Sequence, residues 1–330
     1  MDVNQAGEIR EARVDDHDDI KEITADTWPD REGQDYLGRV YPRWLESGSC
    51  PKHTLVVEHE GQAVAIAQCV LLTDHEAWGQ GLRVHPEFRG QGLSQRLTQR
   101  LFSWAQDQGA TVARVLVHAW NEAGLGQARG SGYVPAGTFR WIHPTVSTED
   151  RAQRRLERSN RPWLKAVPEA TVENDPVAAW RAFQGSEGAH IVGGLGLSLD
   201  ESWALSELTP DVLERAAEET ATIVVRTDRG AQAMAYRSRS FEQEDDAGES
   251  ETIAEYGVAT WDDVGCAAVL LDAIAQQAAE LGADRIRIAV PDRPTYLSDG
   301  ALCRATVSES GEVVMAADLS GTTDFQTLFE

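Results

Sequence analysis

The chain has 330 residues, which is too long for one average domain and suits two of ordinary size. Its 54 acidic and 30 basic residues give a formal net charge of −24 and an isoelectric point near 4.7. A protein of this charge repels nucleic acid, and no apolar run approaches the length of a membrane span. Three of the basic residues are lysines, and the acids are scattered rather than clustered. We therefore expect a halophilic protein that stays hydrated in concentrated salt, rather than an acidic docking surface for a basic partner.

The four cysteines are Cys50, Cys69, Cys266 and Cys303. They form no CxxC pair and no cluster with histidines, so the sequence predicts neither a metal site nor a disulfide framework. The N-terminal residues contain no apolar core of the kind that a signal peptide needs. These features predict a cytoplasmic protein with reduced thiols.

In chain order, the first half alternates strand and helix signals. We expect a strand at residues 9–14, a helix from Asp15 to Trp28 and a second helix at 33–47. A hairpin follows, whose first strand ends near Glu58 and whose second strand runs from Ala63 to Leu72. The remaining elements are a strand at 76–84, a helix from near Ser94 to Gly109, a buried strand at 113–119, a short helix capped by Asn121, and a last strand at 138–143.

Residues 82–97 have the one spacing that predicts a specific chemistry. An extended run is followed by a glycine-containing loop and then by an amphipathic helix. The glycines let a bulky ligand approach the backbone amides, and the first turn of the helix presents unpaired N–H groups to phosphate oxygens. The residues that we expect at this site are Leu82, Val84, Arg89, Gly90, Gln91, Gly92, Leu93 and Ser94.

This loop has neither the third glycine of a dinucleotide fingerprint nor the Gly-Lys-Ser/Thr of a Walker loop. It resembles the acyl-CoA pyrophosphate loop of the GNAT N-acetyltransferases, because Val84, Arg89 and Gly92 match that family's pattern and Ser94 stands in for its last small residue. The element order across residues 8–143 is also similar to that family. The resemblance implies a mixed α/β sheet and acetyl-CoA, or another acyl-CoA, as cosubstrate. It further implies that Asn121 contacts the cofactor, although capping a helix is an equal alternative.

The rest of the chain repeats part of this pattern. Residues 147–162 read as a charged linker, and residues 163–330 as a second domain, because TIVVRTDRG and GADRIRIAV echo segments of the first domain, residues 1–146. Asp262 and Asp263 fall where the first copy has Arg89 and Gly90, and Pro294 falls at the position of Asn121. We therefore interpret the second half as a degenerate GNAT-like domain. Within it, residues 240–252 are expected to form a disordered or long loop.

The sequence offers two candidates for the catalytic base. Glu76, expected on the same strand face as Trp78, Gln80, Leu82 and Val84, is one candidate base, and His118 is the other. Ala128 stands at the position of the tyrosine that many GNAT enzymes use as an acid. The sequence therefore predicts the type of reaction but not its rate. The resemblance implies an N-acetyltransferase for a small-molecule or peptide amine, as a monomer or homodimer. The alternatives are a non-catalytic acyl-CoA sensor and a structural protein. Trp28, Tyr36 and Trp44 are candidates for the acceptor pocket or the core.

Overall fold

A computed structural model describes residues 7–25, 27, 35–46, 48, 50–146, 170–244 and 250–321. By its contacts the chain divides into two compact units. The first comprises the residues up to Val117, Asn121–Pro135 and the residues from Val314 on, and the second comprises His118–Trp120 and Ala136–Val313. The expected linker at residues 147–162 and the candidate Trp28 lie outside the described residues.

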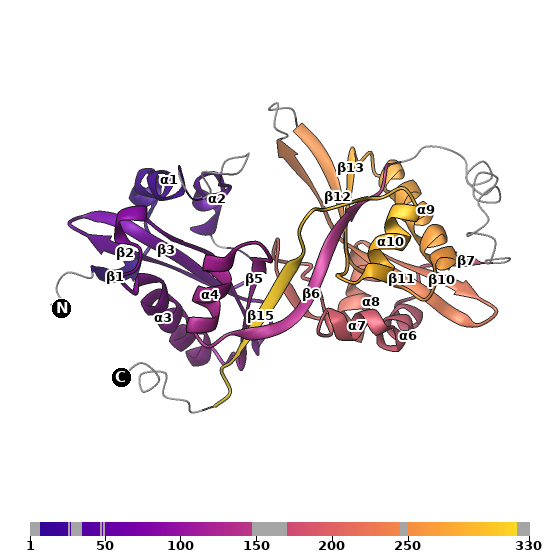
Figure 1. Ribbon diagram of the computed structural model, residues 1–330, viewed down its shortest axis with the longest axis horizontal. Helices are drawn as coiled ribbons and strands as arrows, with labels where there is room; N and C mark the ends of the chain where they lie inside the picture. The colour runs from indigo at the N-terminus through magenta and orange to yellow at the C-terminus, as the bar shows by residue number, and fades with distance from the viewer. Residues whose placement is uncertain are drawn as a thin grey trace. The chain divides into compact units, whose positions relative to one another are not determined.

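The first unit is built on a mixed sheet (Figure 1). Its strands in spatial order are β1 (Glu8–Glu11), β2 (Lys52–His59), β3 (Gln62–Leu71), β4 (Glu76–Val84), β5 (Val112–His118) and β15 (Glu312–Asp318). The pairs from β1 to β4 are antiparallel, and β5 is parallel to β4. The mixed sheet expected from the sequence is therefore confirmed.

Helices cover both faces of this sheet (Figure 1). On one side are α1 (His17–Ala25), which follows a 3₁₀ turn at Val14–Asp16, and α2 (Leu37–Trp44), and on the other are α3 (Leu93–Asp107) and α4 (Glu122–Gly130). Both α1 and α2 are shorter than expected. The residues of α3 that recur every four positions, from Leu93 to Ala105, are buried, as the amphipathic pattern predicts.

The second unit repeats this topology. Its sheet contains β7 (Thr171–Glu173), β10 (Ala221–Thr227), β11 (Gly230–Glu244), β12 (Ser250–Trp261), β13 (Arg285–Pro291) and β6 (Val134–His143), in that spatial order. The first three pairings are antiparallel and β12 pairs with β13 in parallel, as β4 does with β5. A short β14 (Thr306–Val307) pairs with β6, and β8 (Leu195–Leu197) pairs with β9 (Leu205–Glu207).

Helices α6 (Pro176–Gly185), α7 (Glu187–Ile191) and α8 (Pro210–Glu219) lie on one side of the second sheet, and α9 (Val264–Glu280) and α10 (Pro294–Leu302) on the other (Figure 1). Ile274 and Leu270 of α9 are fully buried, as is Leu97 of α3. The common order of strands and helices shows that the repeat seen in the sequence is also a repeat of structure.

Two features of the second unit differ from expectation. Residues 240–252 are not one long loop, because residues 240–244 extend β11 and residues 250–252 begin β12, and only residues 245–249 lie outside the description. In addition, most of the last strand of each sequence half belongs to the other unit. Residues 136–143 of β6 belong to the second unit, and the part of β15 from Val314 on belongs to the first. The domain boundary expected at residue 146 therefore does not coincide with the division between the two units.

Candidate active site

The candidate site lies where β4 and β5 diverge. The two strands pair only from Glu76–Val112 to Gly79–Val115, while β4 continues to Val84 and β5 to His118. In the described register, the edge of β4 that faces β5 has no strand partner beyond Gly79. A parallel pair that opens in this way leaves a backbone edge to which an extended ligand can bond.

A bulge shapes the open half of β4. Gln68 of β3 opposes Gln80, but Ile66 opposes Arg83, so β4 has one residue more than β3 between these pairs. The extra residue reverses the side-chain alternation. Arg83 therefore shares a face with Gln80, and the expectation that Leu82 and Val84 lie on that face is wrong.

Gly81 lies in this bulge with a φ of 64°, and a Cβ there would overlap the ring of Trp44 from α2. The ring thus covers the backbone where the strand turns, as only glycine permits. Beside it, the side-chain amide of Gln80 donates to Gln68 (2.7 Å) and that of Gln68 to Thr54 (2.7 Å). This hydrogen-bond chain is shielded, because Gln68 is 1% exposed.

The loop after β4 presents backbone amides to solvent. A 3₁₀ turn at Pro86–Phe88 precedes Arg89, Gly90, Gln91 and Gly92, all of which are exposed. Gly92 is the N-cap of α3, has a φ of 75°, and makes no side-chain cap. Within the described part of the chain we find no acceptor for the backbone N–H groups of residues 90–95. The space around Gly90 and Gly92 is also open.

The other residues expected at this site have defined surroundings. Arg89 donates from Nε to the Val84 carbonyl (3.2 Å), which holds its exposed guanidinium beside the loop. Leu93 points into the core, so only its backbone amide can meet a ligand. Asn121 caps α4 by accepting from the amide of Gly124 (2.9 Å), so the structure shows its helix-capping role.

The corresponding terminus in the second unit is closed. Only two residues connect β12 to α9, where eight connect β4 to α3, so the glycine loop has no counterpart. Asp263, the N-cap of α9, accepts from the amide of Cys266 (2.9 Å) and pairs with Arg229 (3.0 Å). Although burial alone would raise the pKa of the Asp263 carboxyl, these two contacts hold it below its usual value. The Asp263 carboxylate thus takes the place at the start of α9 that a bound anion would need.

Glu76 lies in a different environment from the one expected of a base. It is 2% exposed and forms a buried ion pair with Arg114 of β5, and Thr73 donates to its other oxygen (3.3 Å). It also lies at the paired end of β4 and β5, eight residues before Val84. These contacts describe a structural ion pair, and they argue against Glu76 as the group that accepts a proton from a substrate.

His118 keeps features of a base. Its side chain is 35% exposed, its Nδ1 lies 2.7 Å from a carboxylate oxygen of Glu312, and its ring stacks on Trp120 at 5.2 Å. A carboxylate beside Nδ1 orients the imidazole ring. Ala128 is buried in α4 and supplies no acid, while Tyr133 is buried against Phe102, and burial raises the pKa of its hydroxyl.

Arg83 and Asp35, near β4, were not expected at the site, whereas Tyr36 was a candidate for the acceptor pocket or the core. The Nε of Arg83 lies 2.6 Å from a carboxylate oxygen of Asp35, and its guanidinium lies over the ring of Tyr36 (5.9 Å). Asp35 and Tyr36 precede α2, and Tyr36 is 41% exposed. Only the bulge places Arg83 on this face, and the sequence signals that bulge by Gly81 alone.

Together, the mixed sheet, the diverging strands and the glycine loop form a mixed α/β fold of the GNAT kind. Residues 17–133 match the model of the Acetyltransferase (GNAT) family. This segment lies in the first half and carries the loop, so the family match concerns that half of the chain.

Solved structures extend the fold to nearly the whole chain. The chain is similar to a GCN5-related N-acetyltransferase from Sphaerobacter thermophilus, with a TM-score of 0.57, 16% identity, and coverage of 96% of this chain and 97% of that one. It is also similar to a putative acetyltransferase from Thermoplasma acidophilum, with a TM-score of 0.54, 17% identity, and coverage of 94% and 99%. At this identity the likeness shows the fold alone. A search of curated proteins gave no match.

Two further findings limit the kinds of site present. In the part of the chain that the structure describes, no group of three or more metal-binding side chains comes together. No described helix has the length and hydropathy to cross a bilayer.

Proposed function

We propose that the first unit binds an acyl-CoA, with acetyl-CoA as the simplest case, and transfers its acyl group to an amine. The observation that carries this proposal is the set of amides at residues 90–95, which no described group of the protein occupies. Diphosphate oxygens accept hydrogen bonds from such amides, and the positive end of the α3 dipole adds attraction. The open edge of β4 then offers backbone groups to the pantetheine arm.

The transfer itself requires a neutral amine and a polarised thioester carbonyl. A backbone N–H on the open part of β4 is suited to polarise the carbonyl. We assign proton removal from the amine to His118, with Glu312 orienting its ring. The thiolate can leave without a protein acid, since a thiol has a pKa of about 8.5. Ala128 therefore limits the rate rather than the type of reaction.

The acceptor is proposed to be a primary amine of a small molecule or a peptide. The surroundings of Arg83 bear on this choice, because its ion pair with Asp35 and the partly exposed ring of Tyr36 lie beside the bulge of β4. The strongly negative protein also attracts cationic amines. We propose that the second unit is a degenerate copy that takes no acyl-CoA, because Asp263 closes the end of α9.

The binding claim is tested by two substitutions of equal size at one position. Gly92 has a left-handed backbone, which asparagine and aspartate tolerate better than other residues. Gly92→Asn and Gly92→Asp should unfold at similar temperatures, but the aspartate should weaken acetyl-CoA binding by at least about tenfold more, since like charges repel strongly near a protein surface. Isothermal titration calorimetry gives both affinities.

The matched control is Gly126→Asp on α4, where the space around the glycine is open. It adds the same charge to the first unit and should leave binding unchanged. Equal affinities of the two Gly92 variants, or no saturable heat with the unchanged chain, would remove the phosphate-loop assignment.

A non-catalytic acyl-CoA sensor is the second candidate, favoured by the absence of an acid at Ala128. A thiol-release assay with acetyl-CoA over a panel of amines and peptide N-termini separates the two functions. Turnover that falls at least tenfold in His118→Gln, with acetyl-CoA affinity kept, supports the enzyme. Binding without any amine-stimulated thiol release supports the sensor.

A further inference from the structure

The second unit contains a pocket that the acyl-transfer proposal does not use. Its volume is about 270 Å³, and it is lined by residues of α6, of α7, of the turn after α7 and by Leu208, which follows β9. All of these residues belong to the second unit. Sites for drug-sized ligands have volumes of about 300–1,000 Å³, so this pocket suits a molecule of one or two rings.

Hydrogen bonds hold the pocket in shape. At the corner between α6 and α7, the buried hydroxyl of Ser186 donates to the Phe183 carbonyl (2.7 Å) and accepts from the amide of Ala189 (3.2 Å). On the other side, the carbonyl of Gly194 accepts from the amide of Leu208 (3.0 Å). Phe183, Ala189, Gly194 and Leu208 all line the pocket. Because its walls are already ordered, a ligand does not have to order them on binding.

The walls of the pocket are apolar and partly aromatic. Phe183, Ala189 and Leu208 are buried side chains, so only a small part of each faces the pocket. Trp180 is half-buried, and its ring centre lies 6.1 Å from that of Phe183 at an interplanar angle of 33°. Aromatic and aliphatic walls of this kind suit a flat ring.

Two polar side chains complete the lining. Gln184 of α6 and His190 of α7 are exposed, so both can meet a ligand. In the described part of the chain, neither side chain has a hydrogen-bond partner within the protein. The Gln184 amide offers a donor and an acceptor side by side, and a neutral imidazole offers one of each. A ligand that itself carries a donor beside an acceptor can pair with them.

The charge of the pocket favours an uncharged ligand. Its lining contains no acidic side chain, no lysine and no arginine. The net charge of −24 repels an anion, and an anion would find no cation in this lining. A cation would likewise find no carboxylate there, and placing a charge against apolar walls without a partner is costly.

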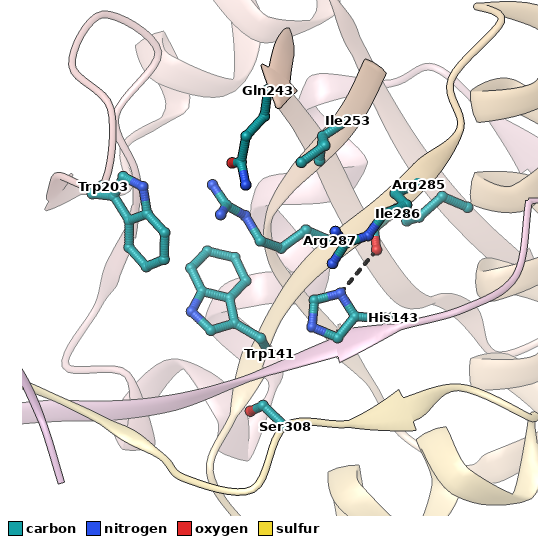
Figure 2. Close-up of a pocket in the computed structure, with 9 residues that line it drawn as sticks. All are labelled: Trp141, His143, Trp203, Gln243, Ile253, Arg285, Ile286, Arg287 and Ser308. Atoms are coloured by element: carbon teal, nitrogen blue, oxygen red, sulfur yellow. Dashed lines mark hydrogen bonds between the residues drawn. The ribbon is translucent and has the colours of Figure 1, made fainter. Parts of the chain in front are cut away.

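A second cavity in this unit offers no comparable site. Figure 2 shows residues that line it, among them Trp141, Trp203 and Arg287. The guanidinium of Arg287 lies 4.8 Å and 4.4 Å from the ring centres of Trp141 and Trp203, and it pairs with the buried Glu255. These rings and this charge therefore have partners within the protein. No described cation lies over the two rings of the pocket beside α6.

We propose that the pocket beside α6 binds a small uncharged aromatic molecule that carries a donor next to an acceptor, as a carboxamide does. The ring packs against Trp180 and Leu208, and the polar group bonds to Gln184 and His190. The site lies within the second unit and does not rest on acyl-CoA binding, so either proposal can fail without the other.

Titration calorimetry of the full chain with benzamide tests the proposal. Benzoate is the control of similar shape with a negative charge, and acetamide is the control that has the carboxamide but no ring. Benzamide should bind saturably, in the millimolar range or tighter. Benzoate and acetamide should bind at least about tenfold more weakly, because the first adds an unpaired charge and the second loses the ring contacts.

Gly194→Asn is the first variant. Gly194 has a φ of 73°, which asparagine tolerates, and the space where its Cβ would stand is open. The added side chain should fill part of the pocket and weaken benzamide binding by about tenfold or more. Gly282→Asn is the matched control, because Gly282 has a φ of 69° and open space beyond the end of α9. It should bind benzamide as the unchanged chain does.

Gln184→Leu is the second variant, and it keeps the test valid if Gly194→Asn fails to fold. It removes the amide from an exposed position of α6, so benzamide affinity should fall about threefold to tenfold, as expected for lost hydrogen bonds between neutral groups. Four results would overturn the proposal: no saturable binding of benzamide, equal binding of benzoate or acetamide, unchanged affinity in the folded variants, or an equal loss in Gly282→Asn.

Discussion

At the scale of single residues, the structure assigns Glu76 a structural role. Its buried pair with Arg114 on β5 has a close parallel in the second unit, where Glu255 of β12 pairs with Arg287 of β13. Arg114 and Arg287 occupy the same position of the sequence repeat, five residues after Gly109 and Gly282. Each pair joins the two parallel strands of its own sheet near their paired ends.

Breaking one of these pairs should destabilise the fold rather than the chemistry. Glu76→Gln leaves Arg114 buried without its charge partner, so the free energy of unfolding should fall by roughly 3 kcal/mol, while acetyl-CoA affinity stays the same. Urea denaturation and calorimetry measure the two quantities. The double variant Glu76→Leu/Arg114→Met should be more stable than Glu76→Gln, because no charge is left unpaired. A large loss of thiol release in Glu76→Gln at unchanged stability would instead restore Glu76 as the base.

At the scale of elements, local patterns predicted most of the first half. The strand at 76–84, the cap at Asn121 and the helix after the glycine loop all follow from spacings of a few residues. The bulge is marked in the sequence by Gly81 alone and was not predicted, because one inserted residue reverses the side-chain faces without altering the apolar pattern. The grouping of β6 and β15 with the opposite units also escaped prediction, since pairing between distant strands has no local signal.

One element junction should respond to acid. Asp16, 5% exposed, accepts from both terminal nitrogens of Arg10 (2.9 and 2.7 Å) and from the amide of Arg13 (2.7 Å), and so joins β1 to the start of α1. Burial alone would raise the pKa of the Asp16 carboxyl, but these bonds outweigh it and hold the pKa below its ordinary value of 3.8. A carboxyl of this kind stabilises the folded chain above its unfolded pKa, and this contribution is lost as the pH falls through the folded pKa.

Asp16→Asn should therefore be clearly less stable than the unchanged chain at pH 7, and this difference should shrink as the pH drops below about 4. Urea denaturation across this range measures it. Asp18→Asn is the control, because the side chain of Asp18 is 94% exposed and pairs with Lys21 at the surface. A stability difference that stays constant with pH would contradict the assignment.

At the scale of the whole molecule, the charge of −24 should dominate the response to salt. Dispersed like charges repel one another in the folded state, and raising the salt from 0.1 M to 1 M shortens the screening length from about 10 Å to about 3 Å. Composition alone predicts this property, which no single contact of the structure shows. We propose on this basis that the protein is halophilic, with a haloarchaeal source.

The midpoint of thermal unfolding should rise by about 5 °C or more between these two concentrations of KCl, a gain of roughly 1–2 kcal/mol. Sucrose at matched osmolality is the control, because it does not screen charge. An unchanged midpoint in KCl, or an equal rise in sucrose, would contradict a stabilisation by screening.

The most direct test of the central claim is a crystal structure of the full chain with acetyl-CoA. We predict that the diphosphate oxygens lie within about 2.7–3.2 Å of the backbone nitrogens of residues 90–95, and that the pantetheine arm bonds to the β4 edge beyond Gly79. A cofactor bound at the start of α9, or one whose diphosphate makes no contact with the loop after β4, would contradict the account.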